Sequence, residues 1–167
     1  LVSSNLWPDL GLPIPRFLVL QRGPWRLGIL GVAPADGKLF SAPAPELRRL
    51  IASMESVDIT ILLSALDDRQ NRELAAQLNS LDLIVSHGGA DKTEIGGTTM
   101  VSARSMGTHV GRVDFKRSAG GELILAGAAQ IAVDSHLPGL PAVQQIVDEF
   151  YRSAAVDAPE PQISPTN

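Results

Sequence analysis

The chain has 167 residues, a net charge of −4 and no cysteine, so disulfides, thiolate catalysis and cysteine-based metal sites are excluded. Its 44% hydrophobic and 19% charged residues are typical of one globular domain, and no apolar run is long enough to predict a membrane span. The acidic balance and the 4% of aromatic residues argue against a nucleic-acid partner, and only three histidines, His87, His109 and His136, are available to metals or proton transfer.

The first third of the chain predicts a hairpin followed by a helix. Two β-rich runs flank Gly23-Pro24, a pair of residues that is typical of a tight turn. After a loop rich in proline and alanine, apolar residues recur at helical spacing at Leu47, Leu50 and Met54. The expected elements are a short strand over 1–6, hairpin strands over 16–20 and 25–32, a loop over 33–45 and a helix over 46–56.

The middle third predicts a strand–helix–strand unit. Segments 57–64 and 81–86 are continuous apolar runs, as expected of strands that are buried on both faces. Between them Asp67 and Gln70 have the spacing of a capping box, and the helix that follows places Leu74 on its inner face. The connections are short, which favours a parallel pair of strands with a right-handed crossover.

The last third predicts strands and one final helix. A polar, glycine-rich loop over 87–97 precedes three strand candidates, and alternating side chains in the second favour antiparallel pairing. Parallel pairing followed by antiparallel pairing predicts an α/β fold, a layered sandwich of mixed sheets flanked by helices. The remaining expected elements are strands over 98–103, 109–116 and 122–133, a helix over 142–153 and a proline-containing tail or linker over 156–167.

Polar residues follow the two predicted parallel strands at the edge where ligands approach such a sheet. Asp67, Asp68, His87 and Asp91 are weak candidates for ligands of a divalent cation, because carboxylates and imidazoles are common metal ligands. The competing interpretation makes the first two a helix cap, Asp91 a solvated loop charge and His87 an exposed imidazole. We favour this second interpretation, and we expect His109 and His136 at the surface.

Glycine pairs and serines near this edge carry weaker signals. Gly88-Gly89 and Gly96-Gly97 match neither of the glycine-rich phosphate-binding patterns, so tight turns explain them better. Ser64 and Ser86 lie outside the G-x-S-x-G pattern of serine hydrolases. We therefore expect neither a phosphate cradle nor a serine nucleophile here.

Several segments match one family in order and spacing. Leu63-Ser64-Ala65 is similar to an L-S-H motif, and the run from Asp82 to Ala90 is similar to a D-L-I-I strand that ends in G-G-H-T-H. Ser3-Ser4-Asn5-Leu6 is similar to an S-A-N strand, and segments 25–32, 97–115 and 141–151 are similar to a further strand, a hairpin and an exit helix. The chain thus resembles the calcineurin-like metallophosphoesterase domain of the 5′-nucleotidase family.

The resemblance implies that the metal site is degenerate. The three histidine ligands that this half of the family domain supplies correspond to Ala65, Gly88 and Ala90, which have no metal-binding side chain. His87 is one residue out of register and, in an extended segment, is expected to point to the opposite side. The resemblance also implies that residues 1–155 are the C-terminal portion of the domain, an excised piece whose partner is a missing N-terminal half or a C-terminal domain.

Two functions follow from this resemblance. In the first, the chain is a non-catalytic derivative with a binding or scaffold role and needs no cofactor. In the second, it belongs to a phosphomonoesterase or nucleotidase that uses a divalent metal pair (Zn, Mn or Mg), with the other ligands on the N-terminal half. Upstream D-x-H, G-D and G-N-H motifs would favour the second. The compartment is undetermined from the residues, and the resemblance alone favours a periplasmic or extracellular location.

Overall fold

A computed structural model describes residues 1–7, 11–88, 92–102, 108–120, 123–133 and 139–156. The chain divides into two compact units, Leu1–Val133 and Asp134–Asn167. The predicted tail over 156–167 lies outside the described residues except for its first residue, which ends a helix.

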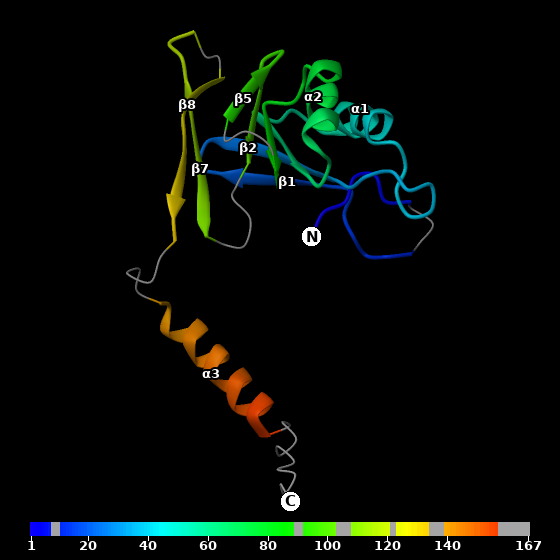
Figure 1. Ribbon diagram of the computed structural model, residues 1–167. Helices are drawn as coiled ribbons and strands as arrows, with labels where there is room; N and C mark the ends of the chain where they lie inside the picture. The colour runs from blue at the N-terminus through cyan, green and yellow to red at the C-terminus, as the bar shows by residue number, and fades with distance from the viewer. Residues whose placement is uncertain (8–10, 89–91, 103–107, 121–122, 134–138, 157–167) are drawn as a thin grey trace, which may run out of the picture. The chain divides into compact units, whose positions relative to one another are not determined.

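The first unit is built on a six-stranded mixed sheet with the order β1-β2-β3-β4-β6-β5 (Figure 1). β1 and β2 form the predicted antiparallel hairpin, and β2, β3, β4 and β6 run parallel to one another. The predicted strand–helix–strand unit is therefore confirmed. The strands are β1 (Phe17–Arg22), β2 (Trp25–Val32), β3 (Ile59–Ser64), β4 (Leu83–Ser86), β5 (Lys92–Ile95) and β6 (Thr98–Ser102).

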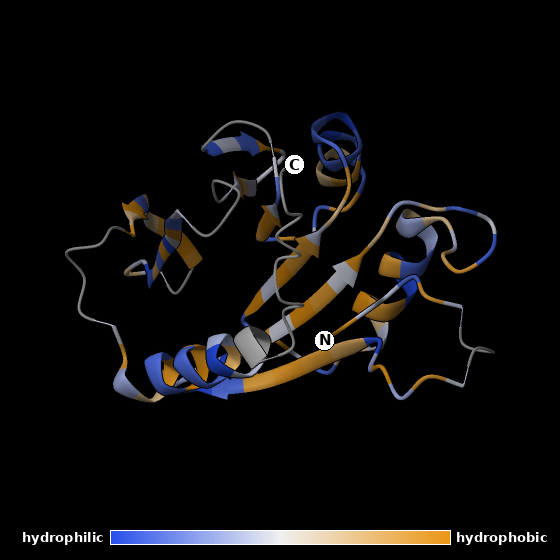
Figure 2. Cartoon of the chain, turned by 60° about the horizontal axis from the view of Figure 1, so that its bottom comes forward, coloured by the Kyte–Doolittle hydropathy of each residue, from blue (hydrophilic) through white to orange (hydrophobic). Residues whose placement is uncertain are grey.

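The hydrophobic core lies between this sheet and the helices α1 (Pro43–Ser53) and α2 (Asp68–Gln77). One row of paired residues crosses four strands, and all of its members are buried: Leu30, Leu62, Ile84 and Met100. These side chains pack in one cluster with Leu47 of α1 and Leu74 of α2, so both helices cover the same face of the sheet. Figure 2 shows the hydrophobic character of these central strands.

The predicted capping box of α2 is present. The Asp67 carboxylate accepts the Gln70 backbone N–H at 2.7 Å, and the Gln70 side chain accepts the Asp67 N–H at 3.2 Å. By contrast, α1 begins at Pro43, three residues before the predicted start. Proline fits the first turn of a helix because its missing N–H would have no partner there, so the helix extends back to the first of the two prolines.

The predicted strand over residues 1–6 is wrong. Only an isolated bridge between Leu6 and Phe40 forms, while the Ser4 N–H donates to the Gly31 carbonyl at 2.6 Å and the Gly31 N–H donates to the Ser4 hydroxyl at 3.0 Å. A Cβ on Gly31 would lie 2.4 Å from the Val2 carbonyl oxygen, so this close approach requires glycine. One backbone hydrogen bond and one side-chain hydrogen bond to Gly31 thus take the place of a regular strand ladder in this segment.

The region between β4 and β6 also differs from the prediction. β5 lies within the expected loop over 87–97 and pairs antiparallel with β6 through a turn in which Gly96 and Gly97 have φ values of 57° and 90°. β6 itself is parallel to β4 and antiparallel to β5. β5 has only four residues and includes Lys92 and Glu94, so its composition resembles that of a loop. The glycine pair is a tight turn, as expected.

A separate two-stranded sheet is formed by β7 (His109–Arg117) and β8 (Leu123–Ala132), with a bulge between Asp114 and Phe115. It contacts the larger sheet through the side chains of Gln130 and Arg117. The Gln130 side chain donates to the Ser102 carbonyl at 2.8 Å, and the Arg117 guanidinium lies 4.6 Å from the centre of the Trp25 ring. Arg117 also forms an ion pair with Asp58. These contacts hold the hairpin on the sheet.

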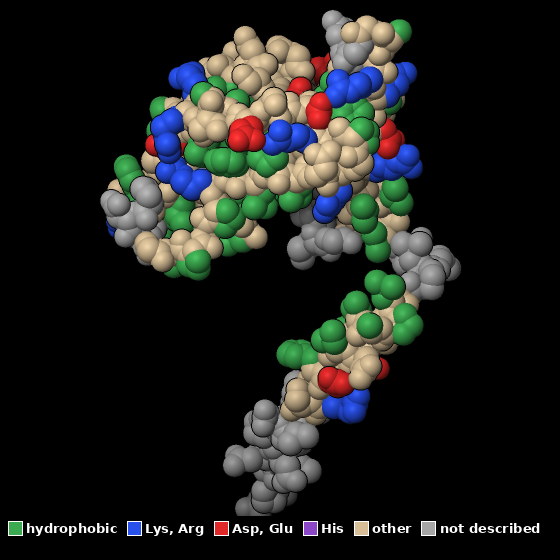
Figure 3. Space-filling model, turned by 180° about the vertical axis from the view of Figure 1, so that it is seen from behind, with side chains coloured by type: hydrophobic (Ala, Val, Ile, Leu, Met, Phe, Trp, Pro, Cys, Tyr) green, Lys and Arg blue, Asp and Glu red, His purple; other side chains and the backbone are tan. Residues whose placement is uncertain are grey.

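The second unit contains α3 (Pro141–Val156), which matches the predicted final helix. Its side chains are exposed as far as they are described, including the apolar stripe of Val143, Ile146, Val147 and Phe150. Figure 3 shows hydrophobic side chains on the surface of this helix. Among the described helices, none is both long and apolar enough to cross a membrane.

Arg16, just before β1, forms an ion pair with Glu46 of α1, and this pair should make the stability of the fold depend on pH. The hydrogen bond from Arg49 and the attraction of Arg16, 2.8 Å away, hold the pKa of Glu46 below its ordinary value of 4.5. A lowered carboxyl pKa stabilises the fold above the unfolded pKa, and this contribution disappears as the pH falls through the folded pKa. We expect Glu46→Gln to lower the free energy of unfolding by about 1 kcal/mol at pH 7.

Urea unfolding at several pH values measures this effect. The difference between Glu46→Gln and the unmodified chain should shrink below pH 4.5. Glu73→Gln is the control, because Glu73 lies 3.7 Å from Arg69 on an exposed helix face. A difference that is independent of pH would mean that the carboxylate charge contributes nothing.

Candidate functional site

The candidate site is the edge where β3 and β4 end. Leu63 pairs with Val85 and Ser64 with Ser86, so Ala65 and His87 are the next residues on neighbouring parallel strands. Both line an open groove of about 770 Å³. The structure places His87 on the same side as Ala65, whereas we expected it on the opposite side. The reason is that the register matches His87, and not Gly88, with Ala65.

The groove lies on the face of the sheet that the helices leave uncovered. Residues in β2 and β3 alternate, so Leu30 and Leu62 point into the core while Ile29 and Leu63 point into the groove. Leu63 is 43% exposed although it is in a central strand. The apolar part of the lining includes Leu6, Leu18, Ile29, Phe40, Leu63 and Val85.

The two serines at the strand ends are hydrogen-bonded inside the protein. The Ser64 hydroxyl donates to Oδ1 of Asn71 at 2.6 Å and accepts the Leu66 N–H at 3.1 Å, and Asn71 in turn donates to the Leu66 carbonyl. The Ser86 hydroxyl donates to the Gly88 carbonyl at 2.7 Å. Both serines are buried, so they fix the backbone at the groove and are not placed as nucleophiles.

The structure places the candidate aspartates of α2 in structural roles. Asp67 caps the helix, and Asp68 forms an ion pair with Arg72 at 2.7 Å. Asp91, like Ala90 and His136, lies outside the described residues. His109 is at the start of β7, where its Nδ1 lies 3.0 Å from the Thr108 hydroxyl. The candidate ligands are therefore not brought together in the part of the chain that the structure describes.

Sequence reasoning missed Asn71, which holds the loop after β3. Asn71 is fully buried on the inner face of α2, beside Leu74 and Ala75. A single amide on an otherwise apolar helix face was the available signal, because a buried amide needs hydrogen-bond partners. Its partners are the two ends of the Ser64–Leu66 turn.

Two aspartates with shifted pKa values lie at the opposite end of the parallel strands. Burial raises the pKa of Asp82, whose carboxylate accepts the Thr60 N–H at 2.7 Å. The hydrogen bond from the Arg26 N–H lowers the pKa of Asp58. These aspartates precede β4 and β3, so they secure the amino ends of the strands and do not contribute charge to the groove.

The donors at this edge do not fit a pair of divalent cations. Each metal of such a pair needs several nitrogen or oxygen ligands, and the two ions share the site. The described side chains of Ala65, Ser64, Ser86 and His87 supply one uncommitted imidazole. No group of three or more His, Asp or Glu side chains within the described ranges is placed to hold a metal.

Neither a protein-family model nor a curated protein matches the sequence. Solved structures do match. Sulfate thiohydrolase SoxB of Thermus thermophilus matches with a TM-score of 0.73 and 21% identity, over 92% of this chain and 32% of the other. A 5′-nucleotidase precursor of the same species matches with a TM-score of 0.73 and 18% identity, over 93% and 38% of the two chains.

The chain has the 5′-nucleotidase fold. A third structure with this fold, the NAD nucleotidase of Haemophilus influenzae, matches with a TM-score of 0.63 and 13% identity, over 91% of this chain and 40% of the other. The predicted α/β class with mixed sheets and flanking helices is therefore confirmed. This chain spans about a third of the length of these proteins.

Proposed function

We propose that this chain is part of a 5′-nucleotidase-like metallophosphoesterase domain and that its own residues perform no catalysis. One observation carries the proposal: where β3 and β4 end side by side, Ala65 lies beside His87, so the described residues at this edge supply a single imidazole. Two-metal hydrolysis of a phosphate ester needs ligands that hold both ions and activate water. With Ser64 and Ser86 committed to internal hydrogen bonds, the described residues of this edge do not supply those ligands.

The groove supports a binding or scaffold role. Its lining is largely apolar, and an apolar groove is a surface on which apolar side chains of another part of a protein can be buried. The similar proteins are between two and three times as long as the chain, which covers 32% to 40% of them. A further part of the same polypeptide is therefore the partner that we propose for this face.

A working phosphomonoesterase is the alternative, and one observation favours it. His87 lines the groove beside Ala65, so its imidazole is on the correct side to join ligands from elsewhere in a longer polypeptide. In that case D-x-H, G-D and G-N-H motifs should precede this segment. The absence of these motifs from the preceding segment would favour the non-catalytic role.

A zinc titration distinguishes the two candidates at the groove. We expect no saturable change in the His87 ring resonances at micromolar Zn²⁺, because a lone exposed imidazole binds metal weakly. Nuclear magnetic resonance of the full chain measures this, with His109 as the internal comparison. A saturable shift at His87 alone would contradict the proposal and favour the enzyme.

A further inference from the structure

The same contact occurs twice where the parallel strands begin. Asp58 precedes β3, and its backbone N–H donates to the Arg26 carbonyl at 2.8 Å while its carboxylate accepts the Arg26 N–H at 2.7 Å. Asp82 precedes β4 and contacts Thr60 of β3 in the same way, at 3.1 Å and 2.7 Å. Each aspartate therefore engages both backbone groups of the residue that lies opposite it on the preceding strand.

The two carboxylates take the place of a backbone acceptor. Between parallel strands an N–H group normally donates to a carbonyl of the neighbouring strand. Residues 55–57 and 79–81, which come before the two aspartates, belong to no strand. Thr60 is 4% exposed, and a buried N–H needs a hydrogen-bond partner. The Asp82 carboxylate supplies that partner and so holds Thr60 opposite Asp82.

These contacts distinguish between registers that the hydrophobic pattern does not. Side chains alternate along a strand, so a shift of one residue would turn Leu62 or Ile84 away from the core. A shift of two residues leaves each side chain on its own face, and burial of the same faces does not exclude it. Such a shift would move Asp82 away from Thr60 and leave the Thr60 N–H without its acceptor. The aspartate contacts therefore select the observed register.

The register at the start of the strands sets the alignment at the groove. The same number of residues separates Thr60 from Ser64 and Asp82 from Ser86, and the pairing between these positions is continuous. Ser64 therefore pairs with Ser86, and the residues that follow them line the groove together.

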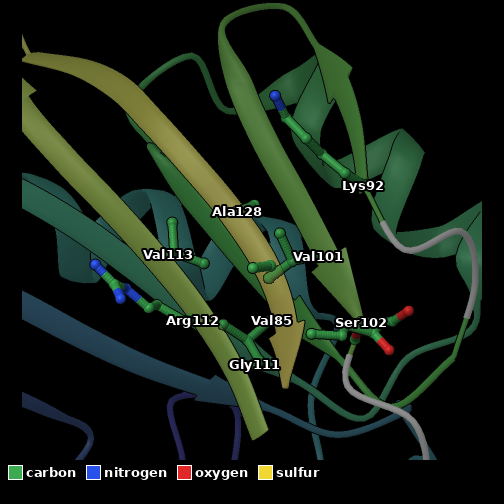
Figure 4. A pocket seen from close by; sticks show the side chains of 10 residues that line it. Val85, Lys92, Val101, Ser102, Gly111, Arg112, Val113 and Ala128 are labelled. Carbon is green, nitrogen blue, oxygen red and sulfur yellow. Dashed lines mark hydrogen bonds between the residues drawn. The ribbon is translucent and has the colours of Figure 1, made fainter. Parts of the chain in front are cut away.

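Asp82 also aligns β4 with its other neighbour, β6. The Asp82 carbonyl accepts the Thr99 N–H at 2.9 Å, and further along the two strands Val85 pairs with Val101. Both valines line a cavity of about 250 Å³ beneath the β7–β8 hairpin (Figure 4). A shift of β4 would therefore change its alignment with both neighbouring strands.

We propose that Asp58 and Asp82 are positioning residues, which set the register of β2, β3 and β4 and thereby place Ala65 beside His87 in the groove. This inference goes beyond the proposed function, because it concerns the alignment of the groove whichever of the two candidate functions is correct. At position 82 the required property is an acceptor oxygen and not a negative charge, since burial raises the pKa of Asp82. Asp82→Asn keeps an acceptor oxygen at this point and should preserve the register.

Disulfide trapping in the full chain reports the register, because the chain has no cysteine of its own. The pair Ala65→Cys, His87→Cys reports the observed register, and the pair Ala65→Cys, Val85→Cys reports a shift of two residues. Residues side by side on neighbouring strands are within reach of a disulfide, whereas residues displaced by two positions are not. With Asp82 intact we expect the first pair to form its disulfide at least about ten times faster than the second.

Changes at position 82 are then introduced into both cysteine pairs. We expect Asp82→Ala to lower the ratio of the two trapping rates at least about tenfold and Asp82→Asn to leave it unchanged. Asp82→Leu, which also lacks an acceptor, is used if Asp82→Ala does not fold. Ile84→Val removes one methylene from the core of the same strand and is the control for lost stability. An unchanged ratio without the acceptor, or an equal fall in Asp82→Asn or Ile84→Val, would overturn the proposal.

Discussion

Replacing Ala65 with histidine is expected to create a zinc site in the groove. Neighbouring strands are about 4.8 Å apart, and Ala65 lies beside His87 on the same side of the sheet, so two imidazoles would face a shared ion. We expect the Zn²⁺ affinity to rise at least about tenfold over the unmodified chain, because a second neutral nitrogen ligand is added. Isothermal titration calorimetry measures the change.

Two controls make this result specific. Ala76→His places the same side chain on an exposed helix face, far in sequence from His87, and should leave the affinity unchanged. The double variant Ala65→His, His87→Ala should lose the gain. If Ala65→His binds Zn²⁺ no better than Ala76→His, the two strand ends do not converge as described. Zinc at 100 times the dissociation constant should also stabilise the fold by about 2.7 kcal/mol.

Asn5→Ala should destabilise the chain severely. Asn5 is fully buried, and its side chain donates to the carbonyls of Ala33 and Ser41 at 2.8 Å and accepts the Ala33 N–H at 3.1 Å. Alanine would leave these backbone groups without partners in the interior, at about 1–3 kcal/mol for each unsatisfied group. We expect the free energy of unfolding to fall by about 3–5 kcal/mol.

Chemical denaturation measures this loss. Asn79→Ala is the matched control, because Asn79 is exposed after α2 and its replacement should change stability by less than about 0.5 kcal/mol. A loss below about 1 kcal/mol for Asn5→Ala would mean that the N-terminal segment is not anchored by this side chain.

The central strands and α2 were predictable because their signals are local and agree with one another. The apolar runs that contain Leu62 and Ile84 predict buried strands, and the Asp67–Gln70 pair predicts where the helix begins. Short connections then permit only a parallel arrangement. Each of these features depends on residues that are close in sequence.

The N-terminal segment and β5 were not predictable for the opposite reason. The Asn5 side chain forms hydrogen bonds with Ala33 and Ser41, which are 28 and 36 residues away. No local sequence pattern predicts hydrogen bonds over such a separation. β5 forms because β6 offers it an edge and Gly96-Gly97 turn the chain, although Lys92 and Glu94 resemble loop residues. Tertiary contacts decided both segments.

The candidate site shows the same division. Parallel pairing means that β3 and β4 end at the same edge of the sheet. It was therefore predictable that Ala65 and His87 lie close to one another. The side to which His87 points depends on the register of β3 against β4, which pairs Ser64 with Ser86. A shift of one residue reverses the side, and the sequence pattern does not determine the register to that accuracy.

A phosphatase assay tests the central claim most directly. The purified chain is incubated with p-nitrophenyl phosphate or AMP and with Mn²⁺, Zn²⁺ or Mg²⁺, and release of product is measured beside His87→Ala. We expect no turnover above the metal-only background for either protein, because one imidazole cannot hold the two metal ions that the reaction needs. Metal-stimulated turnover that His87→Ala abolishes would contradict the account.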